Sequence, residues 1–194
     1  MKILATGFMP FGGQEINPSW EAVKALEGDD IIKVCLPVEW KAGPETLCAA
    51  IAEHRPDCVL MVGQAGGREP VTIERVGFNM CDCKAPDNAG ELRQGTPIRE
   101  GAPDALASTF PFEEIRTALL EAGIPAEYSW NAGRYICNEV LYTALQYARE
   151  NCPGMRAGFI HLPFLPEQTQ DRPSMPAEKQ KKAIALAVEA IRNA

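Results

Sequence analysis

The chain has 194 residues and carries 19 Lys and Arg against 26 Asp and Glu, which gives a formal net charge of −7. Its 46% hydrophobic and 23% charged residues are typical of a globular protein, so the composition excludes intrinsic disorder and collagen-like repeats and suits one domain spanning residues 1–194. The densest basic run is only Lys179, Lys181 and Lys182, so nucleic acid is not expected as a partner of this acidic chain.

The first half of the chain alternates short apolar runs with amphipathic ones. We expect strands at 2–6, 31–38, 58–62 and 71–79, and helices at 18–26 and over the segment that ends at His54. The first helix has a clear start signal, because Asn17 can cap it and Pro18 suits the first helical position. The second is indicated by apolar residues at helical spacing, and it should end before Pro56.

The second half continues this alternation after a loop at about 84–103 that is rich in Pro, Gly, Asp and Asn. We expect helices after Pro111, at about 137–151 and at 176–192, and strands at about 127–130 and 157–162. The alternation predicts the fold class: α/β, a three-layer α/β/α sandwich with a mostly parallel, mixed central sheet. Ligands of such sheets bind beyond the carboxyl ends of the strands, so we expect the chemistry there.

From the sequence we expect neither export nor insertion into a membrane. The opening MKILATGFMP does not match a signal peptide, and no stretch approaches the roughly 18 apolar residues of a membrane span, so no membrane association is expected. Seven cysteines are an odd number without a compact framework, which predicts reduced, buried thiols and a cytoplasmic location. Cys81 and Cys83 form only a C-x-C pair, too little for a zinc site, and no metal is expected.

Cys137 and His161 are the side chains best suited to nucleophilic catalysis. Cys137 enters a predicted helix directly after the turn at 131–133, where backbone N–H groups and the helix dipole lower a thiol pKa and can hold an oxyanion. His161 lies near the tip of a predicted strand, whereas His54 is expected at a helix end. The two residues lie on consecutive strand–helix units, which tend to be neighbours, so they could meet. A packed structural thiol and a core histidine remain the alternatives.

Glu74 is the third candidate for this site. It lies in a predicted strand in which Thr72, Val76 and Phe78 share its face, so its carboxylate points the same way as apolar side chains. A buried carboxylate needs a partner, and an imidazole in that place would be held in one tautomer. An ion pair or an edge position would satisfy the same pattern.

Two glycine-rich turns follow predicted strands, at 7–13 and 63–67. Neither has the spacing of GxGxxG or GxxxxGK[ST], so phosphate binding is only weakly indicated. The glycines would instead let the backbone approach a small ligand. Phe8 and Phe11 flank the first turn, and as exposed aromatics they could hold a flat ring between them, with core filling as the alternative.

Five motifs in order carry a resemblance to a known family. They are GFMPFGG with Asn17-Pro18, GQAGGREPVTIERV, APDNAG, WNAGRYICNEV and GFIHLPFLPEQ. Together they resemble pyroglutamyl peptidase I, also called pyrrolidone carboxyl peptidase, a family of cysteine peptidases. The resemblance runs from Met1 to about Gln168, so it covers nearly the whole chain.

The resemblance implies an enzyme that removes N-terminal 5-oxoproline from peptides. Such enzymes need no cofactor, are cytosolic and often assemble as homodimers or homotetramers. By its place in the motifs, Cys137 resembles the family's nucleophile, His161 its general base and acid, and Glu74 the residue that orients the histidine. The positions that match those around the lactam ring are Phe8, Phe11, Asn17, Gln64 and Ile136. Of these, Gln64 is expected to contribute through its backbone.

Three positions depart from the family pattern. Lys84 stands where the family usually has Arg, which loses a planar, bidentate donor near the expected substrate-binding pocket. Met9 stands where members often carry a carboxylate, and Asn131 where Ser or a similar small residue is usual. Two other hypotheses therefore stay open. One is a catalytically impaired pyroglutamyl-peptide binding protein of the same fold, and the other is a nucleoside or phosphate enzyme that uses the glycine turns.

Overall fold

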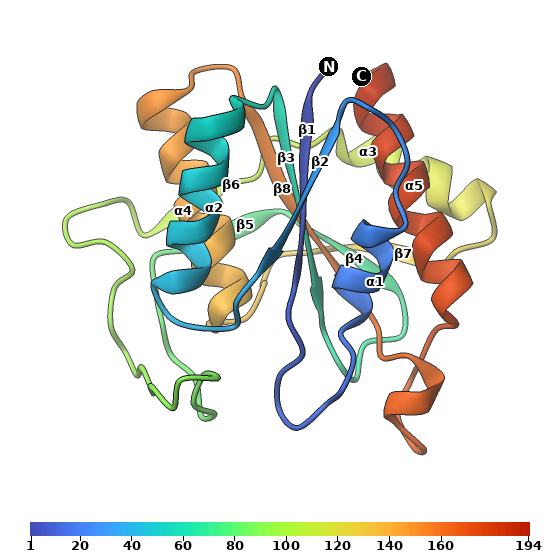
Figure 1. Cartoon of the computed structure of the whole chain (residues 1–194), viewed down its shortest axis with the longest axis horizontal. Helices are drawn as coiled ribbons and strands as arrows, with labels where there is room; N and C mark the ends of the chain where they lie inside the picture. The colour runs from blue at the N-terminus through green and yellow to red at the C-terminus, as the bar shows by residue number, and fades with distance from the viewer.

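The computed structural model describes residues 1–194 as a sheet between two layers of helices (Figure 1). The strands are β1 (Ile3–Phe8), β2 (Ile31–Leu36), β3 (Cys58–Gln64), β4 (Val71–Glu74), β5 (Val76–Phe78), β6 (Ala105–Ala107), β7 (Ala126–Ser129) and β8 (Arg156–Leu162). The helices are α1 (Pro18–Lys24), α2 (Ala42–His54), α3 (Phe112–Glu121), α4 (Ile136–Asn151), α5 (Ala177–Asn193) and the short 3-10 turn η1 (Pro166–Gln168).

The central sheet has six strands in the order β2-β1-β3-β8-β4-β7. The first four are mutually parallel, whereas β4 pairs antiparallel with β8, and β7 runs parallel to β4. Helices α2 and α4 cover one face, and α1, α3 and α5 cover the other (Figure 1). This arrangement confirms the predicted α/β class with a mostly parallel, mixed sheet.

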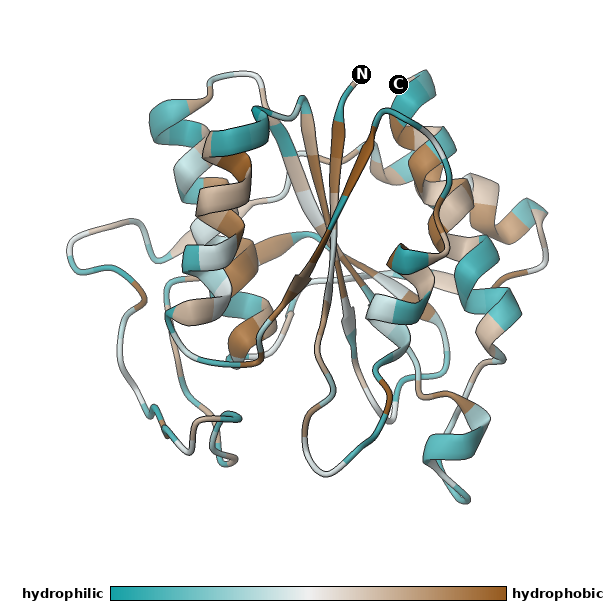
Figure 2. Ribbon diagram, viewed as in Figure 1, coloured by the Kyte–Doolittle hydropathy of each residue, from teal (hydrophilic) through white to brown (hydrophobic).

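Each face of the sheet has its own apolar core. Alternate residues of β1, β3 and β8 point to opposite faces, so Leu4, Met61 and Phe159 join the core under α2 and α4, while Ile3 and Leu60 join the core under α1, α3 and α5. Figure 2 shows hydrophobic residues gathered on the strands and on the helix sides that face them. Burial of these two surfaces is the main term that stabilises the layers.

The start of α1 follows the predicted capping signal. The side chain of Asn17 accepts a hydrogen bond from the Ser19 N–H at 3.1 Å, and Pro18 is the first helical residue. Gly7 explains why this helix lies so close to β1, since a Cβ there would come within 2.6 Å of the Trp20 Cα. The cap and the glycine together fix the connection that follows the first strand.

The strand expected at 71–79 is in fact two strands that belong to different sheets. The break falls at Arg75, whose N–H donates to the Ser129 carbonyl and whose carbonyl accepts from the Ser108 N–H. Beyond it, β5 pairs with β6, a strand that the sequence pattern did not indicate, and Gly77 lies against the Tyr142 backbone. The shared face predicted for Glu74 with residues 76 and 78 is therefore wrong.

The segment 84–103 contains no helix or strand, as predicted (Figure 1). It is held by its own polar groups. Asp87 accepts backbone hydrogen bonds from Trp40, Ala89 and Glu91, and the Asn88 amide donates to the Pro10 carbonyl at 3.0 Å. The loop is thus attached to the connection that follows β1.

All seven cysteines are free thiols, but only Cys58 and Cys81 are buried and the rest are half-buried, so the prediction of buried thiols holds for two of them. No three His, Cys, Asp or Glu side chains cluster as metal ligands would. No helix has the length and apolar character needed to cross a bilayer.

Candidate active site

Cys137 is the second residue of α4, close to the carboxyl ends of β3 and β8. Its half-buried side chain points at the sheet, because a Cβ built on Gly63 of β3 would lie 3.0 Å from the Cys137 Sγ. The N–H groups of Ile136 and Cys137 reach no backbone acceptor, whereas those of the next two residues donate to the Tyr135 carbonyl. The start of α4 therefore offers two free donors beside the sulfur.

His161 lies next to this sulfur on the same face of the sheet. It is the register partner of Gly63 on the adjacent parallel strand, and such strands lie about 4.8 Å apart. Its ring also packs on Phe159, with 4.6 Å between the ring centroids, and a Cβ on Gly63 would touch the same phenyl ring. The structure therefore brings Cys137 and His161 together from segments 24 residues apart in the sequence.

Glu74 is the third member of a row of side chains that begins with Cys137 and His161. Its Oε1 lies 2.8 Å from the His161 Nδ1, and both side chains are almost completely buried. Burial alone would raise the pKa of this carboxyl, but the hydrogen bond and charge of His161, with help from Ser129 and Arg68, hold the pKa below its ordinary value. The ionised carboxylate fixes the proton on Nδ1, so the Nε2 atom is left as the free base of His161.

Arg68 is a member of this site that the sequence reasoning did not single out. Its Nη1 lies 2.6 Å from the Glu74 Oε1 and 2.7 Å from the Thr72 Oγ1, and its Nη2 donates to the Asn131 carbonyl at 2.9 Å. The residue was visible in the motif GQAGGREP, and the burial inferred for Glu74 already required a cation or donor nearby. Spacing could not identify the partner, because Arg68 lies in a connection and not on a strand.

Burial opposes ionisation of the Cys137 thiol. Burial raises its pKa to about 12, the charge of Glu74 adds to the rise, and Arg68 together with the residue's own N–H opposes it. The start of a helix was expected to lower this pKa, and the loss of solvation outweighs that effect. A reactive sulfur would therefore have to be made by transfer of its proton to a neighbouring base.

The two phenylalanines expected to flank a flat ligand differ in exposure. Phe8 is only 2% exposed and packs on Phe159 at 6.2 Å between centroids, so the expectation that it is exposed is wrong. Phe11 is half-buried and lies 6.4 Å from the ring of Tyr135, the residue just before α4. The connection after β1 thus places one ring in the core beneath the site and the other beside it.

The remaining expected pocket residues are placed as follows. Asn17 is buried and its amide donates to the Met9 carbonyl at 3.0 Å. The Gln64 side chain accepts a hydrogen bond from Gln168 at 3.0 Å. The Ile136 side chain is buried, so only its backbone N–H is available to a ligand, and Lys84 is exposed without a hydrogen-bonding partner.

Three side-chain amides hold the connection between β1 and α1 by its carbonyl groups. Asn17 binds the carbonyl of Met9, Asn88 that of Pro10, and Gln168 that of Ile16 at 3.2 Å. The three donors come from the start of α1, from the 84–103 loop and from η1. The position of Phe11 therefore depends on segments from the whole length of the chain.

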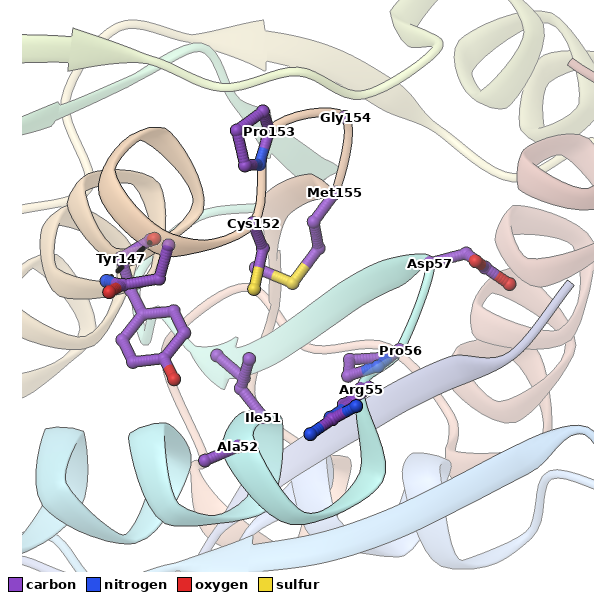
Figure 3. A pocket seen from close by; sticks show the side chains of 11 residues that line it. Ile51, Ala52, Arg55, Pro56, Asp57, Tyr147, Cys152, Pro153, Gly154 and Met155 are labelled. Carbon is purple, nitrogen blue, oxygen red and sulfur yellow. Dashed lines mark hydrogen bonds between the residues drawn. The ribbon is translucent and has the colours of Figure 1, made fainter.

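A separate hollow lies at the opposite end of the sheet (Figure 3). It has a volume of about 780 Å³ and is lined by the ends of α2 and α4 and by the residues before β3 and β8, among them Arg55, Asp57, Tyr147, Cys152 and Met155. Asp57 and Met155 precede their strands, so this hollow is at the amino ends, away from Cys137 and His161. None of the expected site residues contributes to it.

Comparison with known proteins gives one consistent result. The family model described as pyroglutamyl peptidase matches residues 1–194. The chain is 48% identical to the pyrrolidone-carboxylate peptidase of Thermococcus kodakarensis, over 98% of this chain and 96% of that one, and 46% identical to that of Brevibacillus brevis, over 96% and 91%. The crystal structure of Bacillus amyloliquefaciens pyroglutamyl peptidase I superposes with a TM-score of 0.95 at 38% identity and covers 100% of this chain and 97% of its own. The chain therefore belongs to the pyroglutamyl peptidase family.

Proposed function

We propose that this protein is a cysteine peptidase that hydrolyses the bond after an N-terminal pyroglutamyl residue of a peptide. The observation that carries the proposal is the row formed by Cys137, His161 and Glu74, in which the sulfur abuts Gly63, the register partner of His161, and the imidazole is 2.8 Å from the carboxylate. Thiol, imidazole and carboxylate in this order are the groups that acyl transfer needs. The family relationship supports the same activity.

The first half of the reaction forms an acyl-enzyme. The Nε2 atom of His161 takes the proton of the Cys137 thiol, and the thiolate attacks the carbonyl carbon that follows the lactam ring. The N–H groups of Ile136 and Cys137 hold the oxyanion of the tetrahedral intermediate. As the C–N bond breaks, the imidazolium returns its proton to the departing amine, and a thioester remains on Cys137.

Water completes the cycle. His161 accepts a proton from a water molecule that attacks the thioester carbonyl, and the carbon–sulfur bond breaks with return of the proton to the Cys137 sulfur. The products are free 5-oxoproline and the shortened peptide, so no cofactor enters the balance. Glu74 stays ionised throughout and stabilises the imidazolium form of His161 in both halves.

The surroundings suit a neutral lactam. A pyroglutamyl residue has no free α-amine, so an anchoring carboxylate would gain nothing, whereas an apolar slot with a few amide partners can bind the ring. In our proposal Phe11 beside the site and the buried Phe8 beneath it supply the apolar wall. Asn17 and Gln64 supply or position polar groups around it, and Ile136 contributes only its backbone N–H. Buried polar partners left unpaired by an ordinary N-terminal residue would then give the specificity.

The test is release of a chromophore from a pyroglutamyl amide by the wild type, Cys137→Ser and His161→Ala. We expect activity in the wild type and loss of nearly all of it in both variants, and activity that survives in Cys137→Ser overturns the thiol mechanism. A folded wild type that binds 2-pyrrolidone without turnover would instead support an impaired binding protein. Phosphate dependence with indifference to thiol alkylation would support the nucleotide alternative.

Lys84 needs its own test. It is exposed and has no hydrogen-bonding partner in the protein, so its ammonium group is free to contact a substrate, and as a substrate-binding residue it lacks the forked geometry of Arg. We expect Lys84→Arg to raise kcat/KM for the pyroglutamyl amide. An unchanged value would mean that the exchange is neutral.

For its setting and assembly we propose a cytoplasmic homodimer or homotetramer. Seven free thiols suit a reducing compartment, and the family resemblance supports the oligomer. Light scattering on the protein as it elutes from a size-exclusion column should give the mass of two or four chains. A single-chain mass at micromolar concentration would refute the oligomer.

A further inference from the structure

Arg68 contacts the site from the connection between β3 and β4, and no step of the mechanism above uses it. We propose that Arg68 is a positioning residue, which ties Glu74 to the turn that precedes Cys137 and offsets the negative charge of Glu74 at the sulfur. The proposal rests on the function proposed above. It assigns one guanidinium two separable tasks, one that needs its shape and one that needs only its charge.

The shape task follows from the two arms of the guanidinium. Nη1 donates to the Glu74 Oε1 at 2.6 Å and to the Thr72 Oγ1 at 2.7 Å, so it bonds two side chains of β4. Nη2 donates to the carbonyl of Asn131 at 2.9 Å, in the turn six residues before Cys137. A planar fork can make both sets of bonds at once, and a lysine ammonium at the same place cannot reproduce that geometry.

The charge task follows from what faces the sulfur. The ionisable groups around Cys137 are Glu74 of β4, His161 of β8, Arg68, and Tyr135, whose pKa is raised to about 12 mainly by burial. The Glu74 carboxylate opposes formation of a thiolate, and the Arg68 cation favours it. When the proton moves from sulfur to imidazole, the site holds two positive and two negative charges with Arg68, and a net negative charge without it.

Each task predicts a different variant. Arg68→Met removes both the fork and the charge. Arg68→Gln is also neutral but keeps an N–H donor for Glu74, and Arg68→Lys keeps the charge without the fork. The matched control is Arg75→Met, because Arg75 is next to Glu74 in the sequence, yet its guanidinium stacks on Phe112 at 3.9 Å on the other face of the sheet.

The first readout does not need a substrate. The rate of Cys137 carbamidomethylation by iodoacetamide is followed against pH, with the modified peptide identified by mass spectrometry because the chain has seven cysteines. Removal of the Arg68 charge should raise the pKa of the thiol further, so at each pH below that pKa we expect both neutral variants to be alkylated roughly 10-fold more slowly than the wild type. Arg68→Lys and Arg75→Met should keep the wild-type profile.

The second readout is hydrolysis of a pyroglutamyl amide. We expect kcat/KM to fall roughly 10- to 100-fold in Arg68→Met, as for a misplaced catalytic group, and to be only partly restored in Arg68→Lys. If the neutral variants fold and their alkylation profile stays in place, the charge task is overturned, and if Arg68→Lys has full activity, the shape task is overturned. Arg68→Gln decides the question if Arg68→Met does not fold. A silent wild type would refute the proposed function, while the alkylation profiles would still test Arg68.

Discussion

Gly63 is the position at which one added methyl group should test the contact between the sulfur and the sheet. A Cβ at this residue would lie 3.0 Å from the Cys137 Sγ and 2.6 Å from the Phe159 Cζ. Its φ lies outside the left-handed region, so an alanine is compatible with the backbone and acts only through these two neighbours. Gly63→Ala therefore presses on the thiol and on the ring that supports His161.

The size of the effect follows from ordinary contact distances. Non-bonded heavy atoms prefer about 3.5–4.0 Å, so the sulfur has to move away by roughly 0.5–1 Å and the Phe159 ring by roughly 1 Å. Displacement of a reacting group by about 1 Å can cost about 100-fold in rate, so we expect kcat/KM to fall roughly 10- to 100-fold. Overpacking should also lower the free energy of unfolding by about 1–3 kcal/mol.

Two measurements separate the local effect from general destabilisation. Hydrolysis of a pyroglutamyl amide gives kcat/KM, and urea denaturation followed by circular dichroism gives the free energy of unfolding. The matched control is Gly158→Ala on β8, whose Cβ would come within 2.4 Å of the Phe110 ring, in the core on the other face. It should lose comparable stability but keep most of the activity at a temperature where it is folded.

The outcomes are distinct. Wild-type kcat/KM in Gly63→Ala, with a stability loss like that of Gly158→Ala, would show that the sulfur does not lie against β3 during turnover. Equal activity losses in the two variants would trace the effect to stability and refute the argument from geometry. Only a loss confined to Gly63→Ala supports the assigned row of thiol, imidazole and carboxylate.

Three further changes test the support of the site. Asn88→Ala removes the hydrogen bond to the Pro10 carbonyl, so we expect it to raise KM for the pyroglutamyl amide several-fold while kcat changes less; an unchanged KM would mean that this bond does not hold the slot. Glu139 lies 3.0 Å from Arg93, and burial raises the pKa of its carboxyl from 4.5 to about 7. Between these two pH values the unfolded chain has already lost the proton that the folded chain keeps. The free energy of unfolding should therefore fall by about 3 kcal/mol as the pH rises from about 4.5 to about 7. Urea titrations should show that Glu139→Gln flattens this dependence, and an unaltered slope would refute the assignment. Asn17→Ala should lower the free energy of unfolding by at least about 1 kcal/mol through loss of the α1 cap, and thermal denaturation that matches the wild type would contradict that role.

The layers of the fold were predictable because each rests on a local signal. Apolar runs located the five strands β1, β2, β3, β7 and β8 to within a few residues, and the cap at Asn17 placed the start of α1. The division of 71–79 into β4 and β5 was not predictable from periodicity. It depends on hydrogen bonds that Ser108 donates to the carbonyls of Glu74 and Arg75, and on the one that the Arg75 N–H donates to the Ser129 carbonyl. Both serines lie more than 30 residues further along the chain.

The candidate site was predictable because few residues of this sequence combine a catalytic side chain with a suitable position in the fold. With two histidines, only His161 lay at the end of a strand, and Cys137 was the cysteine at a helix start. The burial of Phe8 and the upward shift of the thiol pKa were not predictable. Both depend on how closely α4 and Phe159 approach the sheet, a tertiary distance that residue types alone do not set.

The reversed direction of β4 explains why four groups from distant segments meet at one point. Because β4 runs antiparallel to β8, Thr72 lies opposite His161 and Glu74 lies opposite Phe159, one step deeper in the sheet. The carboxylate therefore reaches the imidazole diagonally from below, completely buried, instead of standing at the open edge. The same reversal sends the connection from β3 across the end of β8 to the start of β4, and this connection carries Arg68 to the rim above Glu74. A parallel β4 would place its last residue at the solvent edge, where a carboxylate is screened by water and holds an imidazole less firmly.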